Sequence, residues 1–447
     1  RYGYEPSTGE LEVGFYTKTP WTDEFHAVNL TAEQQLDSGT LLFTSSWFDR
    51  DINFNNDGTT ILAGILGRAP ENARSLLAQP QSRSIWSNEL RYSSNWQGPF
   101  NLVGGVFFQK EKSNFNSRVD SADANGVAEA NPIVYLWRSI DTEIENRSLF
   151  GELSYDLTSK LTATVGARWF QFDVDEQSSL MIACCSGNTP GPGPAAPTAS
   201  SDKDVNYKLN LSYEVNDDLL FYAQAAQGFR SGGNNEPGIS VVPGCQNASS
   251  FSSDGLWNYE IGAKMALLDN RAVVNLTPYY IDWSDMQVRA FNPLCNNARI
   301  ANAGEARIQG VEAEVVLRPV AALQFNLTFN YSDAELTENQ PLATGTGNGT
   351  EGRKGDDIPG VPRTSSSAGV QYSFPVRNAS LEGVLRGDYS YVGSSKTAFR
   401  PLTDPTYRVQ PSYALTNLRF SLVGASWETS LFMNNVFDER AEVTHLV

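Results

Sequence analysis

Histidine is the first residue type to consider for catalysis, and the 447-residue sequence contains two, His26 and His445. Neither lies beside a nucleophile motif, as a Ser-His-Asp triad would require. Neither has cysteine or carboxylate neighbours at the spacing of a metal site. The sequence also lacks a glycine-rich phosphate loop. These observations predict a protein that is not an enzyme and that has no catalytic residues, no dedicated metal site and no cofactor.

Cysteine is the second reactive residue type, and it occurs at Cys184, Cys185, Cys245 and Cys295. An even, small number of cysteines permits disulfides in an oxidising compartment. Cys245 and Cys295 fall in neighbouring predicted loops, so a disulfide between them is one prediction. The adjacent Cys184 and Cys185 form either a vicinal bridge or bonds to other cysteines, and the sequence leaves both possibilities open.

Charge and hydropathy narrow the class of protein further. The net charge is -18 and the pI is about 4.6, which argues against nucleic acid as a partner because little would neutralise its phosphates. Mean hydropathy is -0.35, and no run of about 18 apolar residues is present, so no transmembrane helix is predicted. Aromatic residues make up 11%, and such rings favour a membrane–water interface.

The elements that carry these residues show a period of two. Between positions 322 and 331 the polar residues alternate with an apolar set, which consists of Leu323, Phe325, Leu327, Phe329 and Tyr331. This period places one set on each face of a β-strand. Strands of about ten residues are long enough to cross a membrane when tilted.

The pattern predicts about 17 strands, joined by connections that alternate between short and long. The expected strands are 11–17, 24–36, 39–50, 84–97, 100–112, 143–157, 160–172, 204–215, 218–229, 256–267, 271–283, 307–318, 322–334, 363–373, 380–392, 412–423 and 427–434. A membrane barrel has turns at one rim and loops at the other, so it sorts its connections in this way. The fold class is therefore predicted to be all-β, as a transmembrane antiparallel β-barrel. Residues 71–79 are expected to form a short helix within one of the long loops.

Two groups of polar and aromatic residues lie where strands meet long loops. These candidate substrate-binding residues are Arg230, Asn234 and Asn235 at loop 230–255, and Trp283, Asp285 and Arg289 at loop 284–306. A turn-forming Gly-Asn cluster is the alternative interpretation of the first group, and an interfacial anchor is the alternative for Trp283. Charges expected to face the lumen, among them Glu152, Lys208 and Glu260, have a simple alternative too, because any wide barrel has a polar interior.

Several segments resemble one protein family. AQAAQGFRSGGNN from Ala223, NYEIGAKMALLDNRAVVNLTPYYIDWSDMQV from Asn258, NAGEARIQGVEAEV from Asn302, IPGVPRTSSSAGVQYSF from Ile358 and NNVFDER from Asn434 are similar to segments of TonB-dependent outer-membrane receptors. The segments occur in the family's order and span most of the chain.

The resemblance implies a barrel of about 22 strands filled by an N-terminal plug. It also implies active import of a scarce nutrient, most often a ferric siderophore or similar metal chelate, driven by a periplasmic TonB protein. Residues 1–447 are expected to be a partial barrel domain, without the plug, the first strands and the last strand. The implied surroundings are outer-membrane lipid and lipopolysaccharide. A passive porin and a surface adhesion or scaffold barrel are the alternative functions.

Overall fold

The computed structural model describes residues 14–235, 250–292, 297–302, 304–340, 352–376, 380–399 and 407–441. Within them one 17-stranded sheet dominates, and every pairing in it is antiparallel. Its strands are β1 (Trp21–Leu36), β2 (Gly39–Asp57), β3 (Ser75–Ser94), β4 (Phe100–Ser121), β5 (Val134–Asp156), β6 (Leu161–Ile182), β7 (Pro190–Pro194), β8 (Thr198–Asn216), β9 (Leu219–Arg230), β12 (Asp254–Leu267), β13 (Ala272–Ser284), β16 (Ala306–Val320), β17 (Leu323–Leu336), β18 (Thr364–Pro375), β19 (Glu382–Val392), β22 (Tyr413–Val423) and β23 (Glu428–Met433).

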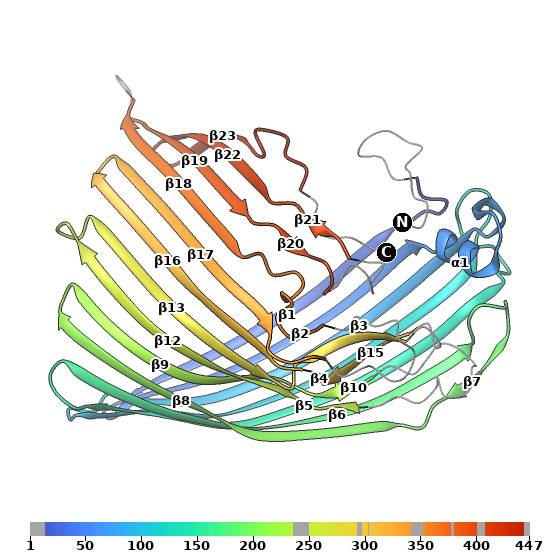
Figure 1. Cartoon of the computed structure of the whole chain (residues 1–447), viewed down its shortest axis with the longest axis horizontal. Coiled ribbons are helices and arrows are strands. Elements are labelled where there is room, and N and C mark those ends of the chain that lie inside the picture. The colour runs from blue at the N-terminus through green and yellow to red at the C-terminus, as the bar shows by residue number, and fades with distance from the viewer. Residues whose placement is uncertain are drawn as a thin grey trace.

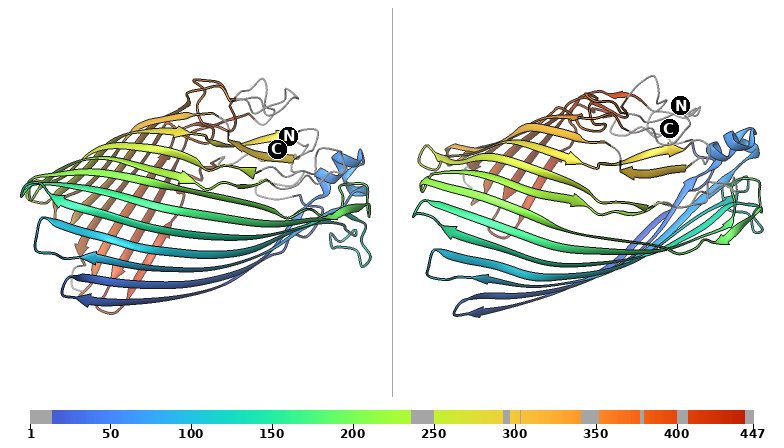
Figure 2. Two further views of the ribbon diagram at one scale, coloured as in Figure 1. Left: turned by 90° about the horizontal axis from the view of Figure 1, so that it is seen from below. Right: turned by 60° about the horizontal axis from the view of Figure 1, so that its bottom comes forward.

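The long strands pair with their neighbours along the chain, as in a meander, and the short β7 pairs with β6. Figure 1 shows them side by side in a single curved sheet. In Figure 2 the orange and red strands face the blue and green strands across an interior. No helix in the described part of the chain is long and apolar enough to cross a membrane.

Small elements lie at the rim that carries the long loops. They are the helix α1 (Thr59–Leu66), the 3₁₀ turn η1 (Pro70–Asn72) and three hairpins, which pair β10 (Gly233–Asn234) with β11 (Ser250–Phe251), β14 (Gln287–Asn292) with β15 (Asn297–Asn302), and β20 (Ser395–Lys396) with β21 (Val409–Gln410). The helix expected over 71–79 is wrong. Gly67, at φ 61°, ends α1, and residues from Leu76 onward pair with β2 instead.

The expected strand 11–17 is also wrong over the residues that the structure describes. Residues 14–17 form a bend at the loop rim rather than a strand. The Tyr16 backbone N–H donates to Asp57 Oδ2 at 2.6 Å, and Lys18 N–H donates to Gly126 O at 2.9 Å. These bonds, to a side chain at the end of β2 and to a loop carbonyl, take the place of the backbone ladder that a further strand would have needed.

Six strands are much longer than expected, because β2 to β6 run for 19, 20, 22, 23 and 22 residues and β8 runs for 19. A membrane needs only about 9–11 residues of a tilted strand. The expected loops 51–83, 113–142 and 173–203 are therefore partly strand. Their polar residues continue the ladder above the apolar band, where alternation of apolar and polar residues is no longer required.

The two faces of the sheet differ in burial. On β5, Asn146 and Ser148 are buried on the concave face, whereas Leu149 is 58% exposed on the convex face. On β6, Phe170 is buried on the concave face, where its ring stacks on that of Phe229 with centroids 3.8 Å apart. The concave face is therefore the lumen side, and the convex face carries the apolar residues expected to meet lipid.

Candidate ligand-capture site at the outer rim

Arg230 is the last residue of β9, and its register partner across the sheet is Asp254, the first residue of β12. The Arg230 Nε donates to Asp254 Oδ2 at 2.9 Å and the Nη2 contacts the same oxygen. The guanidinium carbon lies 4.7 Å from the centre of the Trp283 ring. A cation is attracted to the face of an indole at this distance. The arrangement joins β9, β12 and β13 at the rim.

Asp254 lies at the centre of this arrangement, and its side chain is only 1% exposed. Besides the guanidinium, it accepts hydrogen bonds from the backbone N–H groups of Arg230 at 3.2 Å and Gln287 at 3.0 Å. A buried carboxylate is costly unless its oxygens are paired in this way. Asp254 is not among the residues predicted from the sequence. Asp254 can be identified as a site residue only by its position opposite Arg230, and that position is known only once the register of β9 and β12 is known.

Asparagine side chains tie the two neighbouring loops together. Asn235 Nδ2 donates to Ile300 O at 2.7 Å, and Ile300 N–H donates back to Asn235 Oδ1 at 2.6 Å. Asn302 forms the same reciprocal pair with Ser252, at 2.7 and 2.8 Å. Each side-chain amide thus forms the two hydrogen bonds that a backbone residue of a neighbouring strand would form. The bases of loops 230–255 and 284–306 therefore form one connected body.

The structure brings four of the six predicted site residues into this body, namely Arg230, Asn235, Trp283 and Asp285. Asp285 lies in a turn at φ 52°, and its carbonyl oxygen accepts from Asn302 Nδ2 at 3.0 Å. Asn234 belongs to the β10–β11 hairpin. The backbone of Arg289 pairs with Ile300 in the β14–β15 hairpin, while its side chain lies outside what the structure describes. Ligand binding by these residues stays a prediction.

The cysteine predictions have different outcomes. Cys184 and Cys185 are joined as a vicinal disulfide. Cys245 and Cys295 both lie outside the described residues, so the disulfide predicted between them is not tested.

The lumen wall below the rim carries paired charges. Lys208 Nζ lies 3.1 Å from Glu152 Oε1, as two residues of the same face on strands two apart. On another wall, Arg386 lies 2.8 Å from Asp388. In such pairs the positive and negative charges offset each other, so the lumen surface is polar there without a local excess of one charge. This surface suits contact with hydrated solutes or with a polar protein domain.

Asp357 anchors the loop between β17 and β18. It accepts from Lys396 Nζ at 2.5 Å and from Arg363 Nη2 at 2.8 Å. Burial raises the pKa of the Asp357 carboxyl, but the hydrogen bonds and charges of Lys396 and Arg363 outweigh burial and lower it below the ordinary value of 3.8. The carboxylate therefore ties this loop to the β20–β21 hairpin.

Comparison with known proteins gives a consistent match. The family profile described as "TonB dependent receptor-like, beta-barrel" matches residues 2–436. The pesticin receptor of Yersinia pestis is 24% identical over 281 residues, which cover 63% of this chain and 37% of the receptor. The probable TonB-dependent siderophore receptor PiuA of Acinetobacter baumannii is 22% identical over 308 residues, which cover 67% of this chain and 38% of that receptor. The chain thus spans well under half the length of these relatives.

Solved structures share the fold. The ferric yersiniabactin uptake receptor FyuA from Yersinia pestis superposes with a TM-score of 0.75 at 20% identity, over 96% of this chain and 59% of that chain. The siderophore receptor PiuA from Acinetobacter baumannii superposes with a TM-score of 0.68 at 15% identity, over 96% and 62% of the two chains. These superpositions confirm the predicted outer-membrane β-barrel architecture.

Proposed function

The chain belongs to the TonB-dependent receptor β-barrel family of Gram-negative outer membranes, and from this premise we propose that it is the wall of an active importer of a ferric siderophore or a similar metal chelate. The family is one of transport receptors rather than enzymes. The observation that carries the proposal is the family match across nearly the whole chain, together with the single curved sheet that has a polar lumen face.

The names of the relatives support the class of cargo. They include a probable siderophore receptor, a metal-pseudopaline receptor from Pseudomonas aeruginosa and a ferric yersiniabactin uptake receptor. Each binds its own compound, so the class proposed here is a metal chelate rather than one named molecule. In this proposal the rim residues Arg230, Asn234, Asn235, Trp283, Asp285 and Arg289 contact the chelate.

The proposal includes parts that lie outside this chain. A plug domain fills the lumen, further strands pair with β1 and β23, and a periplasmic TonB protein supplies energy through a segment of the complete receptor. No covalent bond in the cargo has to form or break, so binding and gating are the only chemistry required. Loops 230–255 and 284–306 change position when the chelate binds.

A growth experiment tests this function. A strain that lacks the gene would be compared with the complemented strain under iron limitation, on a panel of catecholate, hydroxamate and carboxylate ferric chelates. We expect growth on at least one chelate to require the gene and also an intact TonB protein. Equal growth of both strains on every chelate would overturn import. Gene-dependent uptake that persists without TonB would indicate a passive porin instead.

A further inference from the structure

Two tyrosine rings lie against the lumen wall, each over a glycine of the neighbouring strand. A Cβ atom added to Gly262 on β12 would lie 2.1 Å from Cε1 and 2.6 Å from Oη of Tyr222, the register partner of Gly262 on β9. A Cβ added to Gly310 on β16 would lie 2.6 Å from Oη of Tyr279, its partner on β13, and 2.2 Å from the carbonyl oxygen of Tyr331. Carbon atoms pack at about 3.5–4.0 Å, so each ring occupies the space that a side chain at the glycine would need.

The ring of Tyr222 crosses β12 on the lumen face. Its hydroxyl lies 3.1 Å from Thr277 Oγ1 on β13. The adjacent residues Phe221 and Leu276 are 44% and 41% exposed on the opposite, convex face, and Gly262 is buried beneath the ring. The strands β9, β12 and β13 are neighbours in the sheet (Figure 1). One ring therefore spans three strands, with a glycine beneath it and a hydrogen bond at its tip.

The same three strands carry the rim arrangement. Arg230, Asp254 and Trp283 belong to β9, β12 and β13, and Thr277 precedes Trp283 on β13. At about 3.3 Å per residue, the hydroxyl of Tyr222 lies about 20 Å below the rim. A cargo that leaves the rim residues toward the periplasm passes this part of the wall when it keeps to the strands that captured it.

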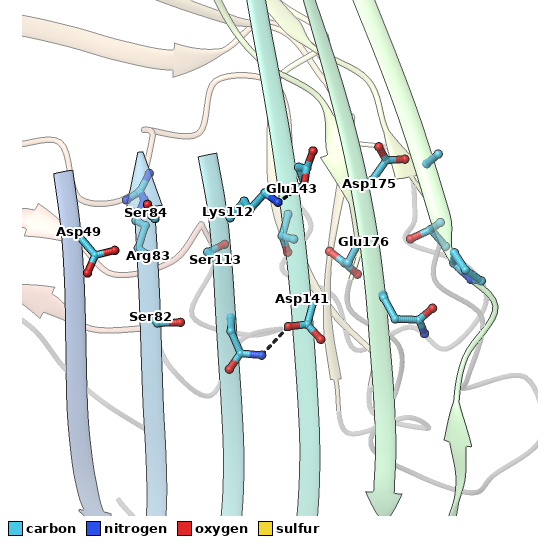
Figure 3. Close-up of a pocket in the computed structure, with 16 residues that line it drawn as sticks. Asp49, Ser82, Arg83, Ser84, Lys112, Ser113, Asp141, Glu143, Asp175 and Glu176 are labelled. Atoms are coloured by element: carbon cyan, nitrogen blue, oxygen red, sulfur yellow. Dashed lines mark hydrogen bonds and ion pairs between the residues drawn. The ribbon is translucent and has the colours of Figure 1, made fainter. Parts of the chain in front are cut away.

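The hollows on the outside of the sheet lie away from such a path. Figure 3 shows a hollow of about 540 Å³ whose lining includes Lys112 and Glu143. Glu143 shares the face of the exposed Leu149 on β5, because residues an even number apart on a strand point to the same side. A second hollow, of about 490 Å³, includes the exposed Tyr259 and Ile261. Both hollows open on the convex face, so a path through the lumen depends on the wall residues of the concave face.

The contact of Tyr222 with Gly262 differs from a similar one on another wall. Phe150 lies over Gly105 of β4, but a Cβ at Gly105 would also lie 2.5 Å from the carbonyl oxygen of Leu90. Backbone contact therefore restricts that position, as it restricts the glycine beneath Tyr279. At Gly262 the three nearest atoms all belong to the Tyr222 ring. The ring alone thus requires a glycine at position 262.

We propose that the wall of β9, β12 and β13 carries the path of the cargo through the lumen, and that Gly262 keeps this path open by holding the Tyr222 ring against the wall. The inference rests on the proposed import function and adds the side of the lumen along which the chelate moves. A methyl group at position 262 displaces the ring from β12 and from Thr277. The flanking lumen positions of β12 hold the long side chains of Glu260 and Lys264, so the displaced ring projects into the lumen.

The test measures capture and transport separately on the complete receptor. The probes are radiolabelled ferric complexes of a tricatecholate, a trihydroxamate and citrate. Capture is the iron bound by cells that lack TonB, and transport is the rate of uptake by cells that contain it. For Gly262→Ala we expect capture as in the wild type and uptake lowered by about fivefold or more, because the displaced ring obstructs a step that follows binding.

A rescue variant and a matched control separate obstruction from a general effect of the added methyl group. Gly262→Ala/Tyr222→Ala removes the displaced ring, and we expect its uptake to return close to the wild-type rate. The control is Gly369→Ala on β18, at a lumen-facing glycine where an added Cβ would meet only side-chain atoms, the nearest being Asp388 Oδ1 at 3.0 Å. This control is expected to capture and import as the wild type does. The heat-modifiable mobility of each variant on a gel reports whether it is folded.

Several results would overturn the proposed path while leaving import intact. One is wild-type uptake by Gly262→Ala, and another is an equal loss of uptake in Gly369→Ala. A loss that persists in the rescue variant, or a Gly262→Ala receptor that does not fold, would assign the glycine to strand pairing instead. Absence of TonB-dependent uptake of all three complexes by the wild type would overturn the import function itself, and the path with it.

Discussion

At the scale of single residues, the buried carboxylate of Asp254 holds the rim together. It accepts from Arg230 and from the backbone of Gln287, and Arg230 lies over Trp283. Arg230 and Trp283 are identifiable from sequence because each stands at a strand end beside a long loop. Their common partner is not identifiable, because Asp254 lies 24 residues from Arg230 and meets it only through the register of β9 and β12.

The substitution Asp254→Asn tests the contribution of the hydrogen bonds that the Asp254 carboxylate accepts. We expect it to loosen the β14–β15 hairpin, because hydrogen bonds to a charged group contribute about 1.5–3 kcal/mol. Hydrogen exchange of peptides that contain Gln287 should then accelerate about tenfold or more. The control is Asp285→Asn, since asparagine tolerates the positive φ of that position. Unchanged exchange in Asp254→Asn would show that the hairpin is held by other contacts.

Asp357 provides a prediction about pH. Its pKa is lowered in the folded protein despite the opposing effect of burial, so the ionised form is favoured by folding. The stabilisation is therefore complete above the ordinary pKa of 3.8 and is lost as the pH falls through the lower folded value. Asp357→Asn removes this contribution at every pH.

We expect the loop that contains Asp357 to exchange faster in Asp357→Asn than in wild type at pH 7, and the difference to vanish at strongly acidic pH. The measurement is hydrogen exchange of the Gly360 N–H, which donates to Lys396 O at 2.8 Å, corrected for the intrinsic pH dependence. A difference of the same size at both ends of the pH range would assign the effect to packing rather than to charge.

At the scale of elements, strand faces follow directly from the sequence. Leu209 is 47% exposed on the convex face of β8, whereas the neighbouring Asn210 accepts a hydrogen bond from Ser212 on the lumen face. Leu209→Arg is expected to lower the free energy of unfolding by about 2–4 kcal/mol, because it places a charge in the lipid layer. Asn210→Arg, one residue away, should leave it nearly unchanged. Denaturant titration in lipid vesicles measures both, and equal effects would contradict the assigned faces.

The ends of the strands were less predictable than their faces. Alternation is imposed only where one face meets lipid, so the sequence marked the membrane band and not the extensions of β2 to β6 above it. There the apolar residues, such as Leu136 and Leu180, form a local buried cluster instead of an alternating lipid-facing row, and the strands persist through hydrogen bonds to their neighbours. The same reason explains the incorrect strand at 11–17. Its residues alternate in type, but among the described residues 14–17 the Tyr16 N–H bonds to the side chain of Asp57, at the end of β2, instead of to the backbone of a neighbouring strand.

At the scale of the whole molecule, the described sheet has two edge strands, β1 and β23. Among the described residues, β1 pairs with β2 and β23 pairs with β22, and neither has a partner at its other edge. An unpaired strand edge in lipid leaves backbone groups without hydrogen bonds, at a cost of several kcal/mol for each group. Further strands of the complete receptor are therefore proposed to cover both edges.

We expect the two uncovered edges to prevent the 447-residue chain from folding alone in lipid. Residues 1–447 alone, diluted from urea into lipid vesicles, should give no heat-modifiable and protease-resistant species, whereas the complete receptor treated in the same way should give one. The reason is that the backbone groups of two exposed edges outweigh the burial of the apolar band in lipid. The appearance of a protected species from the 447-residue chain alone would show that β1 and β23 can pair with each other. In that case a smaller closed barrel, rather than the larger one of the family, would describe this protein.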